Sequence, residues 1–225
     1  MRQHFAHNTQ GSDYVVGDIH GDYERLVALL SKIKFDASVD RLFSVGDLID
    51  RGPASAKCLE LLEEPWFFSV QGNHEDLLQQ AAADPEHAFE LWVLNGGQWG
   101  RELERNLLEH YAARLARLPL VMTVGTGASR FNVFHAEFFG DDQALDQDNY
   151  SKHTREQLLW GRVLVRDATK KNLHSGLSTS FCGHTPLQKP AKIGSHIFID
   201  TGCGFPERKG KLTIAKPAEM RFFQG

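Results

Sequence analysis

The first third of the chain alternates short apolar runs with segments of helical periodicity. Three runs rich in β-branched and aromatic residues predict buried strands, at residues 14–16, 42–45 and 66–70. Leucines at helical spacing predict a helix over residues 22–33, with Asp22 as its cap or in its first turn. Gly52-Pro53 predicts the start of a second helix that extends to about residue 63, and a third is expected from about residue 74 to 83. This β-α-β-α-β order predicts a parallel sheet with helices packed on it.

The pattern changes in the middle of the chain. Residues from about 85 to 118 predict a mainly helical insertion, interrupted at Asn95-Gly96-Gly97. Beyond it, apolar runs at 120–124 and 130–134 predict a hairpin around Gly125-Thr126-Gly127. Later strands are expected at residues 180–182, 196–199 and 212–215. We therefore expect a single α/β domain over residues 1–225, whose second half is mostly antiparallel or mixed.

Composition narrows the class of protein without identifying a function. The 225 residues are 41% hydrophobic and 24% charged, which is ordinary for a globular domain. A formal net charge of −4 argues against a general nucleic-acid binder. No apolar run is long enough to cross a bilayer, and residues 1–13 lack the apolar core of a signal peptide. The three cysteines form no CxxC pair, so we expect reduced thiols in a cytoplasmic protein.

Five motifs of metal-binding or phosphate-binding residues each follow a predicted strand. They are Gly17-Asp18-Ile19-His20-Gly21, Gly46-Asp47-Leu48-Ile49-Asp50-Arg51-Gly52, Gly72-Asn73-His74-Glu75, His135-Ala136-Glu137 and Gly183-His184-Thr185. Taken singly, such an Asp is more often a turn former or helix cap, and such a His an ordinary hydrogen-bonded residue. Five of them in this order have no shared structural reason, and their carboxylate, imidazole and amide groups are ligands of divalent metals.

Six residues are candidate metal ligands: Asp18, His20, Asp47, Asn73, His135 and His184. The carboxyl ends of neighbouring strands meet in one crevice, where open α/β sheets place their sites. Because six ligands exceed the needs of one catalytic ion, we expect two divalent ions, about 3.5–4 Å apart, with Asp47 as the bridge. The other seven histidines lack such a context and are interpreted as ordinary: His4, His7, His87, His110, His153, His174 and His196.

Two metal ions suit the hydrolysis of a phosphate monoester. They lower the pKa of a shared water and neutralise phosphoryl oxygens, so a metal-bridging hydroxide can attack phosphorus in line with the leaving oxygen. His74 follows the ligand Asn73 and is interpreted as the general acid, oriented by Asp50, with a seventh metal ligand as the alternative. Arg51 has the planar fork that holds two phosphate oxygens, and Arg162 is the second expected clamp. A surface ion pair is the alternative for each arginine.

Together the motifs resemble those of the phosphoprotein phosphatase family of metallophosphoesterases. Three further segments resemble its small bacterial and bacteriophage branch, the lambda-phosphatase-like enzymes: Leu159-Trp160-Gly161-Arg162, Gly183-His184-Thr185-Pro186 and Ile199-Asp200-Thr201-Gly202. The resemblance implies a calcineurin-like metallophosphoesterase fold, an α/β architecture with a central mixed β-sandwich flanked by helices. It also implies a dimetal site at the carboxyl ends of the strands.

The resemblance implies specific roles for these residues. One ion would be held by Asp18, His20 and Asp47, and the other by Asp47, Asn73, His135 and His184. Manganese is the expected metal, with iron or zinc as alternatives. The implied activity is a protein serine/threonine phosphatase, extending to phosphotyrosine, whose partners are phosphorylated proteins or peptides. No regulatory subunit is predicted. Glu137 stands where many members have glycine, which changes the rim of the site and leaves the ligand His135 in place.

Other functions remain open on the sequence. A diadenosine tetraphosphatase-like nucleotide hydrolase shares these signatures, although such enzymes are typically longer and carry GNHD where this chain has GNHE. A nuclease or cyclic phosphodiesterase suits Arg51 less well, because its fork fits a terminal phosphate. A catalytically inactive scaffold would normally lack a ligand, and none is missing. Two charged stretches, residues 141–148 and 162–171, are interpreted as solvated faces. The alternative for the second is a groove for an acidic phosphopeptide, lined by Lys170 and Lys171.

Overall fold

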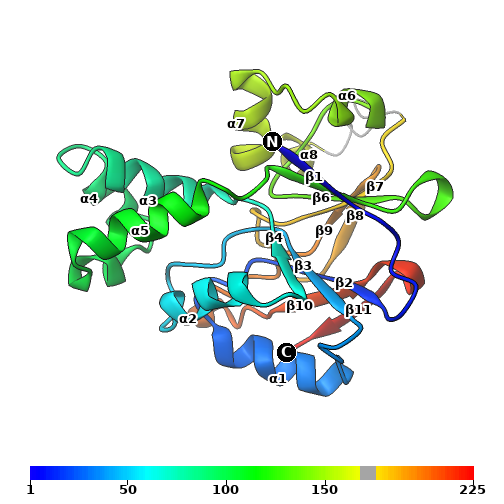
Figure 1. Ribbon diagram of the computed structural model, residues 1–225, viewed down its shortest axis with the longest axis horizontal. Coiled ribbons are helices and arrows are strands. Elements are labelled where there is room, and N and C mark those ends of the chain that lie inside the picture. The colour runs from blue at the N-terminus through cyan, green and yellow to red at the C-terminus, as the bar shows by residue number, and fades with distance from the viewer. Residues whose placement is uncertain (168–175) are drawn as a thin grey trace.

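Two β-sheets pack face to face at the centre of the molecule, between two layers of helices (Figure 1). The computed structural model describes residues 1–167 and 176–225, so Lys170, Lys171 and His174 lie outside the described residues. One sheet has the strand order β11-β10-β2-β3-β4, and the other has the order β1-β5-β6-β7-β9-β8. This is the mixed β-sandwich flanked by helices that the motifs implied.

The first half of the chain builds the parallel part of the five-stranded sheet. Its parallel strands are β2 (Asp13–Val16), β3 (Arg41–Ser44) and β4 (Phe67–Ser69). The helices between and after them are α1 (Tyr23–Ile33), α2 (Ser55–Glu60), the 3₁₀ turn η1 (Leu61–Glu63) and α3 (Asn73–Ala83). Asp22 caps α1, since its carboxylate accepts the Arg25 N–H at 3.3 Å. The second helix begins at Ser55, later than Gly52-Pro53, because the residue before it, Ala54, has a non-helical backbone with φ of −130° and ψ of 41°.

The second half completes both sheets. The six-stranded sheet contains β1 (Arg2–Phe5), β5 (Val121–Val124), β6 (Phe131–Phe134), β7 (Thr179–Cys182), β8 (Ala191–Ile193) and β9 (His196–Phe198). The predicted hairpin is confirmed, because β5 and β6 pair antiparallel around the 3₁₀ turn η3 (Gly127–Ser129). Strands β10 (Thr213–Lys216) and β11 (Arg221–Gln224) pair antiparallel, with the 3₁₀ turn η6 (Pro217–Glu219) between them, and β10 adds antiparallel to β2.

Alternation along the strands separates three apolar clusters. In β2, Tyr14 and Val16 face the layer of α1 and α2, whereas Val15 faces the opposite sheet. Val15 and Phe43 belong to the cluster between the sheets, with Phe181 and Ile197 from the far side. A third cluster lies under α6 (Asp142–Asp146), α7 (Lys152–Trp160) and α8 (Val163–Arg166). The buried side chains hold each strand in place, and the candidate site residues directly follow the ends of these strands.

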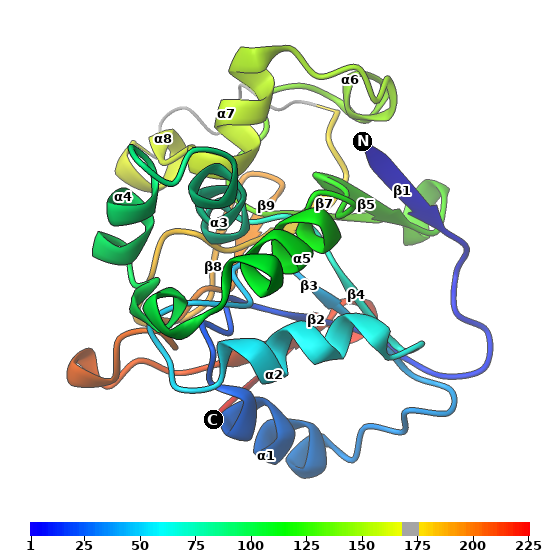
Figure 2. The same ribbon diagram turned by 60° about the vertical axis from the view of Figure 1, so that its left-hand side comes forward.

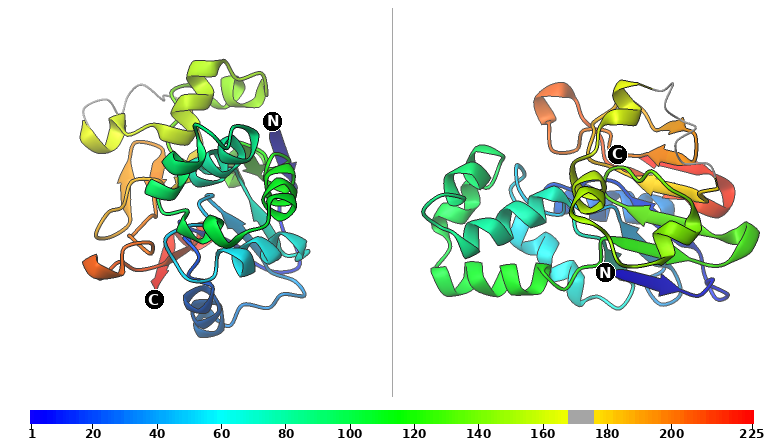
Figure 3. Two further views of the ribbon diagram at one scale, coloured as in Figure 1. Left: turned by 90° about the vertical axis from the view of Figure 1, so that its left-hand side faces the viewer. Right: turned by 90° about the horizontal axis from the view of Figure 1, so that it is seen from above.

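Helices α3, α4 (Phe89–Leu94) and α5 (Arg105–Leu115) form an arm beside the sandwich (Figures 2 and 3). The interruption expected at Asn95-Gly96-Gly97 is the loop between α4 and the 3₁₀ turn η2 (Gln98–Glu102). Trp92 of α4 is fully buried at the base of this arm. Among the residues described here, none of the helices has the length and apolar character that crossing a membrane requires.

The acidic stretch at residues 141–148 has a structural role. Asp146 forms ion pairs with Arg2 and Arg130, both at 2.8 Å. Asp142 accepts the backbone N–H of Ser178 at 2.9 Å. These contacts attach α6 to the six-stranded sheet, so part of the expected solvated face is instead an anchor for a helix.

Candidate metal centre

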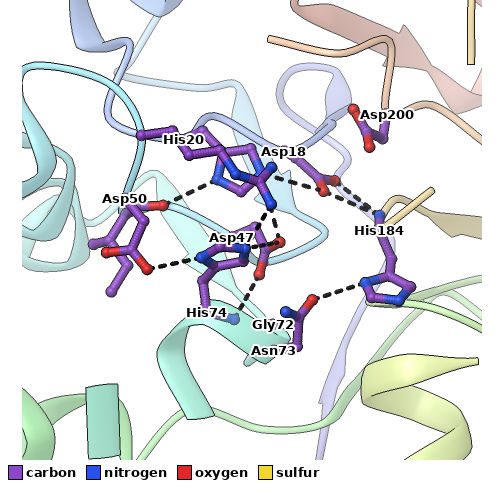
Figure 4. A network of polar contacts seen from close by, with 12 residues as sticks. Asp18, His20, Asp47, Asp50, Gly72, Asn73, His74, His184 and Asp200 are labelled. Carbon is purple, nitrogen blue, oxygen red and sulfur yellow. Dashed lines mark hydrogen bonds and ion pairs between the residues drawn. The ribbon is translucent and has the colours of Figure 1, made fainter. Parts of the chain in front are cut away.

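Every candidate ligand follows the carboxyl end of a strand. Asp18, His20, Asp47, Asn73 and His184 lie together in Figure 4. Asp18 and His20 follow β2, Asp47 follows β3, and Asn73 begins α3 after β4. His135 and His184 follow β6 and β7 of the other sheet. The site is therefore built from both sheets, whereas the sequence indicates only that the ligands follow strand ends.

The backbone at the site is held in unusual conformations. Nine non-glycine residues in the described ranges have a positive φ, and five of them are His20, Asp47, Asp50, Arg51 and His184. Such conformations cost of order 1–3 kcal/mol each for non-glycine residues and persist where the surrounding structure determines them. Because these conformations are concentrated here, we infer that the strand-end turns sacrifice local stability to position the side chains of the site.

Asp47 lies at the centre of the cluster. One of its oxygens is 3.6 Å from His20 Nε2, and the other is 3.5 Å from His135 Nε2. Two overlapping groups, each with ligand atoms within 4.8 Å of one another, share this residue: His20, Asp47 and His74, and Asp47, His135 and His184. Asn73 Oδ1 joins the second group, 2.8 Å from His135 Nε2 and 2.7 Å from His184 Nδ1. A carboxylate between two groups of ligands has the position that a bridging ligand needs.

Backbone carbonyls orient two of the imidazoles. His20 Nδ1 donates to the Ile49 carbonyl at 3.0 Å, and His135 Nδ1 donates to that of Val45 at 2.8 Å. Each hydrogen bond leaves Nε2 as the nitrogen that faces Asp47. This is the supporting arrangement typical of metal-binding histidines, because it fixes both the tautomer and the ring orientation.

The charges of the cluster suit a cation. Burial is the main cause that lowers the pKa of His20, His135 and His184, and it brings that of His184 to about 2. Positive charge on nearby imidazole and guanidinium groups lowers these pKa values further. Burial also raises the pKa of Asp18 well above its usual value, and the charges of Asp200 and Asp47 raise it further. Neutral imidazoles beside crowded carboxylates fit divalent ions, which need deprotonated ligands and relieve repulsion between the acids.

Two glycines allow the carboxylates to approach the backbone. Both oxygens of Asp18 accept the His184 N–H, at 3.0 and 3.2 Å. A Cβ at Gly183 would collide with Asp18 Oδ1, and one at Gly72 would collide with Asp47 Oδ1. Close contact therefore requires both glycines, Gly183 between the two sheets and Gly72 between neighbouring strand ends of the five-stranded sheet.

Similarity to known proteins agrees with this geometry. The family model of the calcineurin-like phosphoesterases matches residues 14–206. The chain belongs to the calcineurin-like phosphoesterase family. It is 38% identical to serine/threonine-protein phosphatase 1 of Salmonella typhimurium over 90% of each chain. It is 30% identical to an asymmetrical bis(5'-nucleosyl)-tetraphosphatase of Geobacillus thermodenitrificans, over 92% of this chain and 90% of the relative.

The fold also resembles solved structures. A protein serine/threonine phosphatase from Saccharomyces cerevisiae superposes with a TM-score of 0.65 at 18% identity, covering 96% of this chain and 76% of the other. At that identity, the likeness concerns the fold alone.

A histidine–aspartate pair lies next to the ligand cluster in this phosphoesterase. His74 Nδ1 and Asp50 Oδ2 are 2.7 Å apart, and both side chains are buried. Burial alone would lower the pKa of His74, but the charges of Asp47 and Asp50 and the Asp50 hydrogen bond outweigh it and raise the pKa. The structure thus brings together the two residues expected to form the acid and its partner.

Asp50 is held by two tryptophans that the sequence did not single out. Trp92 Nε1 donates to both of its oxygens, at 2.9 and 3.1 Å, and Trp99 Nε1 donates to Oδ1 at 2.7 Å. Both come from the helical arm. The carboxylate is thus fixed by N–H donors on one side and by His74 on the other.

The two arginines also reach the site. Arg51 lies between two imidazoles, with one terminal nitrogen 2.6 Å from His20 Nε2 and the other 2.9 Å from His74 Nε2. Arg162 Nε donates to His184 Nε2 at 2.9 Å. Neither guanidinium forms a surface ion pair within the described residues, so that alternative is not what the structure shows.

Three buried acids near the site were not among the predicted ligands, acids or phosphate clamps. Glu75 accepts the backbone N–H groups of Asp47, Leu48 and Gly72, all at 2.8 Å, and so ties two of the motifs together. Burial raises the pKa of Asp200, close to Asp18, to about 6. Glu137 accepts the Leu164 N–H at 2.8 Å and thereby holds the start of α8. Their positions inside or beside the motifs were the signal that could have identified them.

The histidines interpreted as ordinary have ordinary surroundings where they are described. His87 Nδ1 is 2.9 Å from the Asp84 carboxylate on the surface, and His4 is 3.0 Å from Thr123 Oγ1. His196 is buried and its Nε2 accepts the Phe138 N–H at 3.2 Å. None of these three lies in the ligand cluster.

Proposed function

We propose that this phosphoesterase is a metal-dependent protein serine/threonine phosphatase that also accepts phosphotyrosine. The observation that carries the proposal is Asp47, placed between two groups of metal ligands and beside the His74–Asp50 pair. The similarity to serine/threonine-protein phosphatase 1 supports a phosphoprotein as the substrate. The raised thiol pKa values of the free, buried cysteines Cys58, Cys182 and Cys203 suit a reducing cytoplasm.

The residues divide into two ligand sets under this proposal. Asp18, His20 and Asp47 would hold one ion, and Asp47, Asn73, His135 and His184 the other. Manganese is the expected metal, with iron or zinc as alternatives, and the ions would activate water and neutralise the phosphoryl oxygens. His74 clusters with His20 and Asp47, all with ligand atoms within 4.8 Å of one another, but its raised pKa favours a cationic imidazole, which cannot bind a metal.

His74 is therefore proposed as the general acid. Asp50 holds Nδ1, so Nε2 is the nitrogen that faces the site. When a substrate phosphate binds, its oxygens would take over the Arg51 N–H groups that now point at His20 and His74. Nε2 is then free to carry the proton that the leaving alkoxide needs.

Arg51 and Arg162 are proposed to hold the phosphate from two directions. Arg51 comes from the five-stranded side and Arg162 from α8 beside the six-stranded sheet. Two planar guanidinium groups can bind separate pairs of phosphate oxygens, which orients phosphorus for in-line attack. We further propose that residues 1–225 act as one domain, with residues 85–118 as a helical insertion that needs no regulatory subunit.

A dinucleotide polyphosphate is the second candidate substrate, because of the relatives named bis(5'-nucleosyl)-tetraphosphatase. The deciding experiment strips the metal and then adds Mn, Mg, Zn or Fe. Phosphoserine, phosphothreonine and phosphotyrosine peptides are compared with diadenosine tetraphosphate by kcat/KM. Higher kcat/KM on the phosphopeptides is expected, and preference for the dinucleotide would overturn the proposal. Activity without any added or retained metal would overturn the ligand assignment.

A further inference from the structure

A cavity of about 390 Å³ opens beside the metal centre and has a basic wall. It lies between the segment that follows His184 and the turn at residues 201–211. Arg208, Lys209 and Lys211 line it, together with Phe205 and Gln188. The turn projects from the edge of the molecule in Figure 2 and in the left panel of Figure 3.

The basic turn is tied to the phosphate side of the site. A Cβ at Gly204 would come within 2.6 Å of the His20 ring and 2.9 Å of Arg51, so the turn rests directly on these two residues. The Arg51 guanidinium packs on the Phe205 ring, 4.4 Å from its centroid. Arg208 packs on the same ring at 4.9 Å. One aromatic ring thus connects the expected phosphate clamp with the basic wall of the cavity.

The base of the turn is closed by a β-bridge and by two side chains that donate hydrogen bonds to its backbone. Thr201 forms a β-bridge with Lys211, and its hydroxyl donates to the Lys211 carbonyl at 2.7 Å. Arg25 donates to the Gly210 carbonyl at 2.6 Å. The lysines are therefore carried on a braced turn next to the site, where a fixed charge can contribute to recognition.

The positive charge of the turn is mostly uncompensated. Arg208 has a 3.6 Å ion pair with Glu207, and both side chains are largely exposed. Within the described ranges, Lys209 and Lys211 form no ion pair, although the chain as a whole carries a net charge of −4. A ligand with negative charge next to its phosphate would complement this wall.

We propose that this cavity is a substrate subsite for an acidic side chain close to the phosphorylated residue of a phosphopeptide. The subsite rests on the proposed phosphatase activity and specifies its substrate class. The Arg51 and Arg208 guanidinium groups lie 4.4 and 4.9 Å from the centroid of the same Phe205 ring. The two groups are therefore closer together than the length of about three extended residues, at about 3.3–3.6 Å per residue. An acidic residue that reaches the Arg208 end of the wall is thus placed within about three positions of the phosphoresidue.

A peptide fits the cavity better than a nucleoside does. Phe205 is the one aromatic residue among the described residues of its walls, and two guanidinium groups already pack on that ring. Little aromatic surface is left for stacking a base, whereas the lysines offer charge for a carboxylate. Because the polyphosphate of a dinucleotide also carries negative charge, the test includes diadenosine tetraphosphate as an alternative substrate.

The test compares two phosphoserine peptides, one with Asp or Glu at the three positions on either side and one with Asn or Gln there. The wild-type protein should show a lower KM for the acidic peptide. In Lys209→Glu/Lys211→Glu, the KM for the acidic peptide should rise about tenfold. The acidic peptide should then no longer have a lower KM than the neutral peptide. Because both peptides are measured on one preparation, partial unfolding cannot mimic this loss.

The matched control is Lys32→Glu/Lys34→Glu at the far end of α1. It changes the net charge equally, and Lys34, like Lys209, has a left-handed backbone, with φ of 57° and 55° respectively. This control should keep the wild-type preference for the acidic peptide. Equal KM values of the wild type for the two peptides, or a preference that survives in Lys209→Glu/Lys211→Glu, would overturn the subsite and leave the phosphatase proposal standing. Turnover of diadenosine tetraphosphate with neither peptide hydrolysed would instead overturn the proposed function, and the subsite with it.

Discussion

The two arginines at the rim of the site rest on very different supports. On the Arg51 side, the Arg51 backbone N–H donates to the Gly96 carbonyl at 2.9 Å, and the side chain packs on Phe205. On the Arg162 side, the arginine is the N-terminal cap residue of α8, a helix of four residues. That short helix is held at its start by one buried carboxylate, Glu137.

The supports behind the two sides differ as well. Asp50 precedes Arg51 and is fixed by Trp92, Trp99 and His74 at once. Glu137 has one oxygen bonded to the Leu164 N–H, while its Oε2 is buried with no hydrogen-bond partner among the described residues. A side chain fixed by several neighbours positions its partner more precisely than one fixed by a single bond. We therefore expect the Arg51 side to carry the larger share of catalysis.

The largest expected effect tests the acid on the Arg51 side. His74→Asn should lower kcat for phosphoserine peptides by about 10²–10⁴-fold, because the leaving alkoxide loses its proton donor. The kcat of His74→Asn for an aryl phosphate with an activated leaving group should fall much less. Steady-state kinetics on both substrates measure this difference.

The matched control for the acid is His87→Asn, which removes a surface imidazole that also pairs with an aspartate. It should leave kcat unchanged on both substrates. If His74→Asn lowers kcat equally for the poor and the activated leaving group, His74 is not the acid, and metal ligation becomes the better interpretation.

The next effect compares the two arginines directly. Arg51→Ala should lower kcat/KM by about 10²–10³-fold, the usual effect of removing one fixed donor to transition-state charge. Arg162→Ala should lower kcat/KM by a smaller factor, because the short helix α8 holds Arg162 less rigidly. The expected difference is measured with one phosphoserine peptide, and Arg101→Ala, an exposed arginine paired with Glu90, serves as the control. A larger loss in Arg162→Ala would reverse the comparison.

The ligand cluster could be predicted because its information is local. Asp18, His20 and Asp47 each follow an apolar strand within a short motif, and the rule that parallel strand ends meet at one edge brings them together. The regular β-α-β order of the first half was predictable for the same reason, since each element carries its own period. What local pattern cannot supply is the partner across the fold. Trp92 and Trp99 lie 42 and 49 residues from Asp50, and nothing in the sequence of the arm marks them as its donors.

The strands that were not predicted are all at sheet edges. β1 and β8 lie at the two edges of the six-stranded sheet, and β11 lies at one edge of the other. None of their residues is fully buried, so no apolar run indicates them. Edge strands form because a neighbouring strand offers hydrogen bonds, and that neighbour is distant in sequence, as β5 is from β1. The role of Asp200 could not be predicted for the same reason, because it depends on closeness to Asp18, which is distant in sequence.

A pH profile separates the charge of Asp50 from its shape. The charges of Asp47 and Asp50 raise the pKa of His74, and a general acid is active below its pKa, so activity is lost as the pH rises through that value. Asp50→Asn keeps the shape of the side chain but removes its charge, which lowers the pKa of His74. The alkaline limb of kcat for a phosphoserine peptide should therefore move to lower pH.

Asp84→Asn is the control for this profile, because Asp84 pairs with His87 on the surface. Its profile should match that of the wild type. An alkaline limb that stays in place in Asp50→Asn would mean that Asp50 orients His74 without setting its charge, and the Arg51 side would then owe its advantage to geometry alone.

The smallest expected effect concerns the single support on the Arg162 side. Glu137→Ala removes the acceptor of the Leu164 N–H and should raise KM by about two- to tenfold, the range for one hydrogen bond. Burial raises the pKa of Glu137, so a neutral side chain suits the position, and Glu137→Gln, which keeps the acceptor, should restore most of the wild-type KM. If Glu137 acts through Arg162, the double variant Glu137→Ala/Arg162→Ala should be no worse than Arg162→Ala alone. Additive losses would show that Glu137 supports another part of the rim, and α8 would then not be what positions the second arginine.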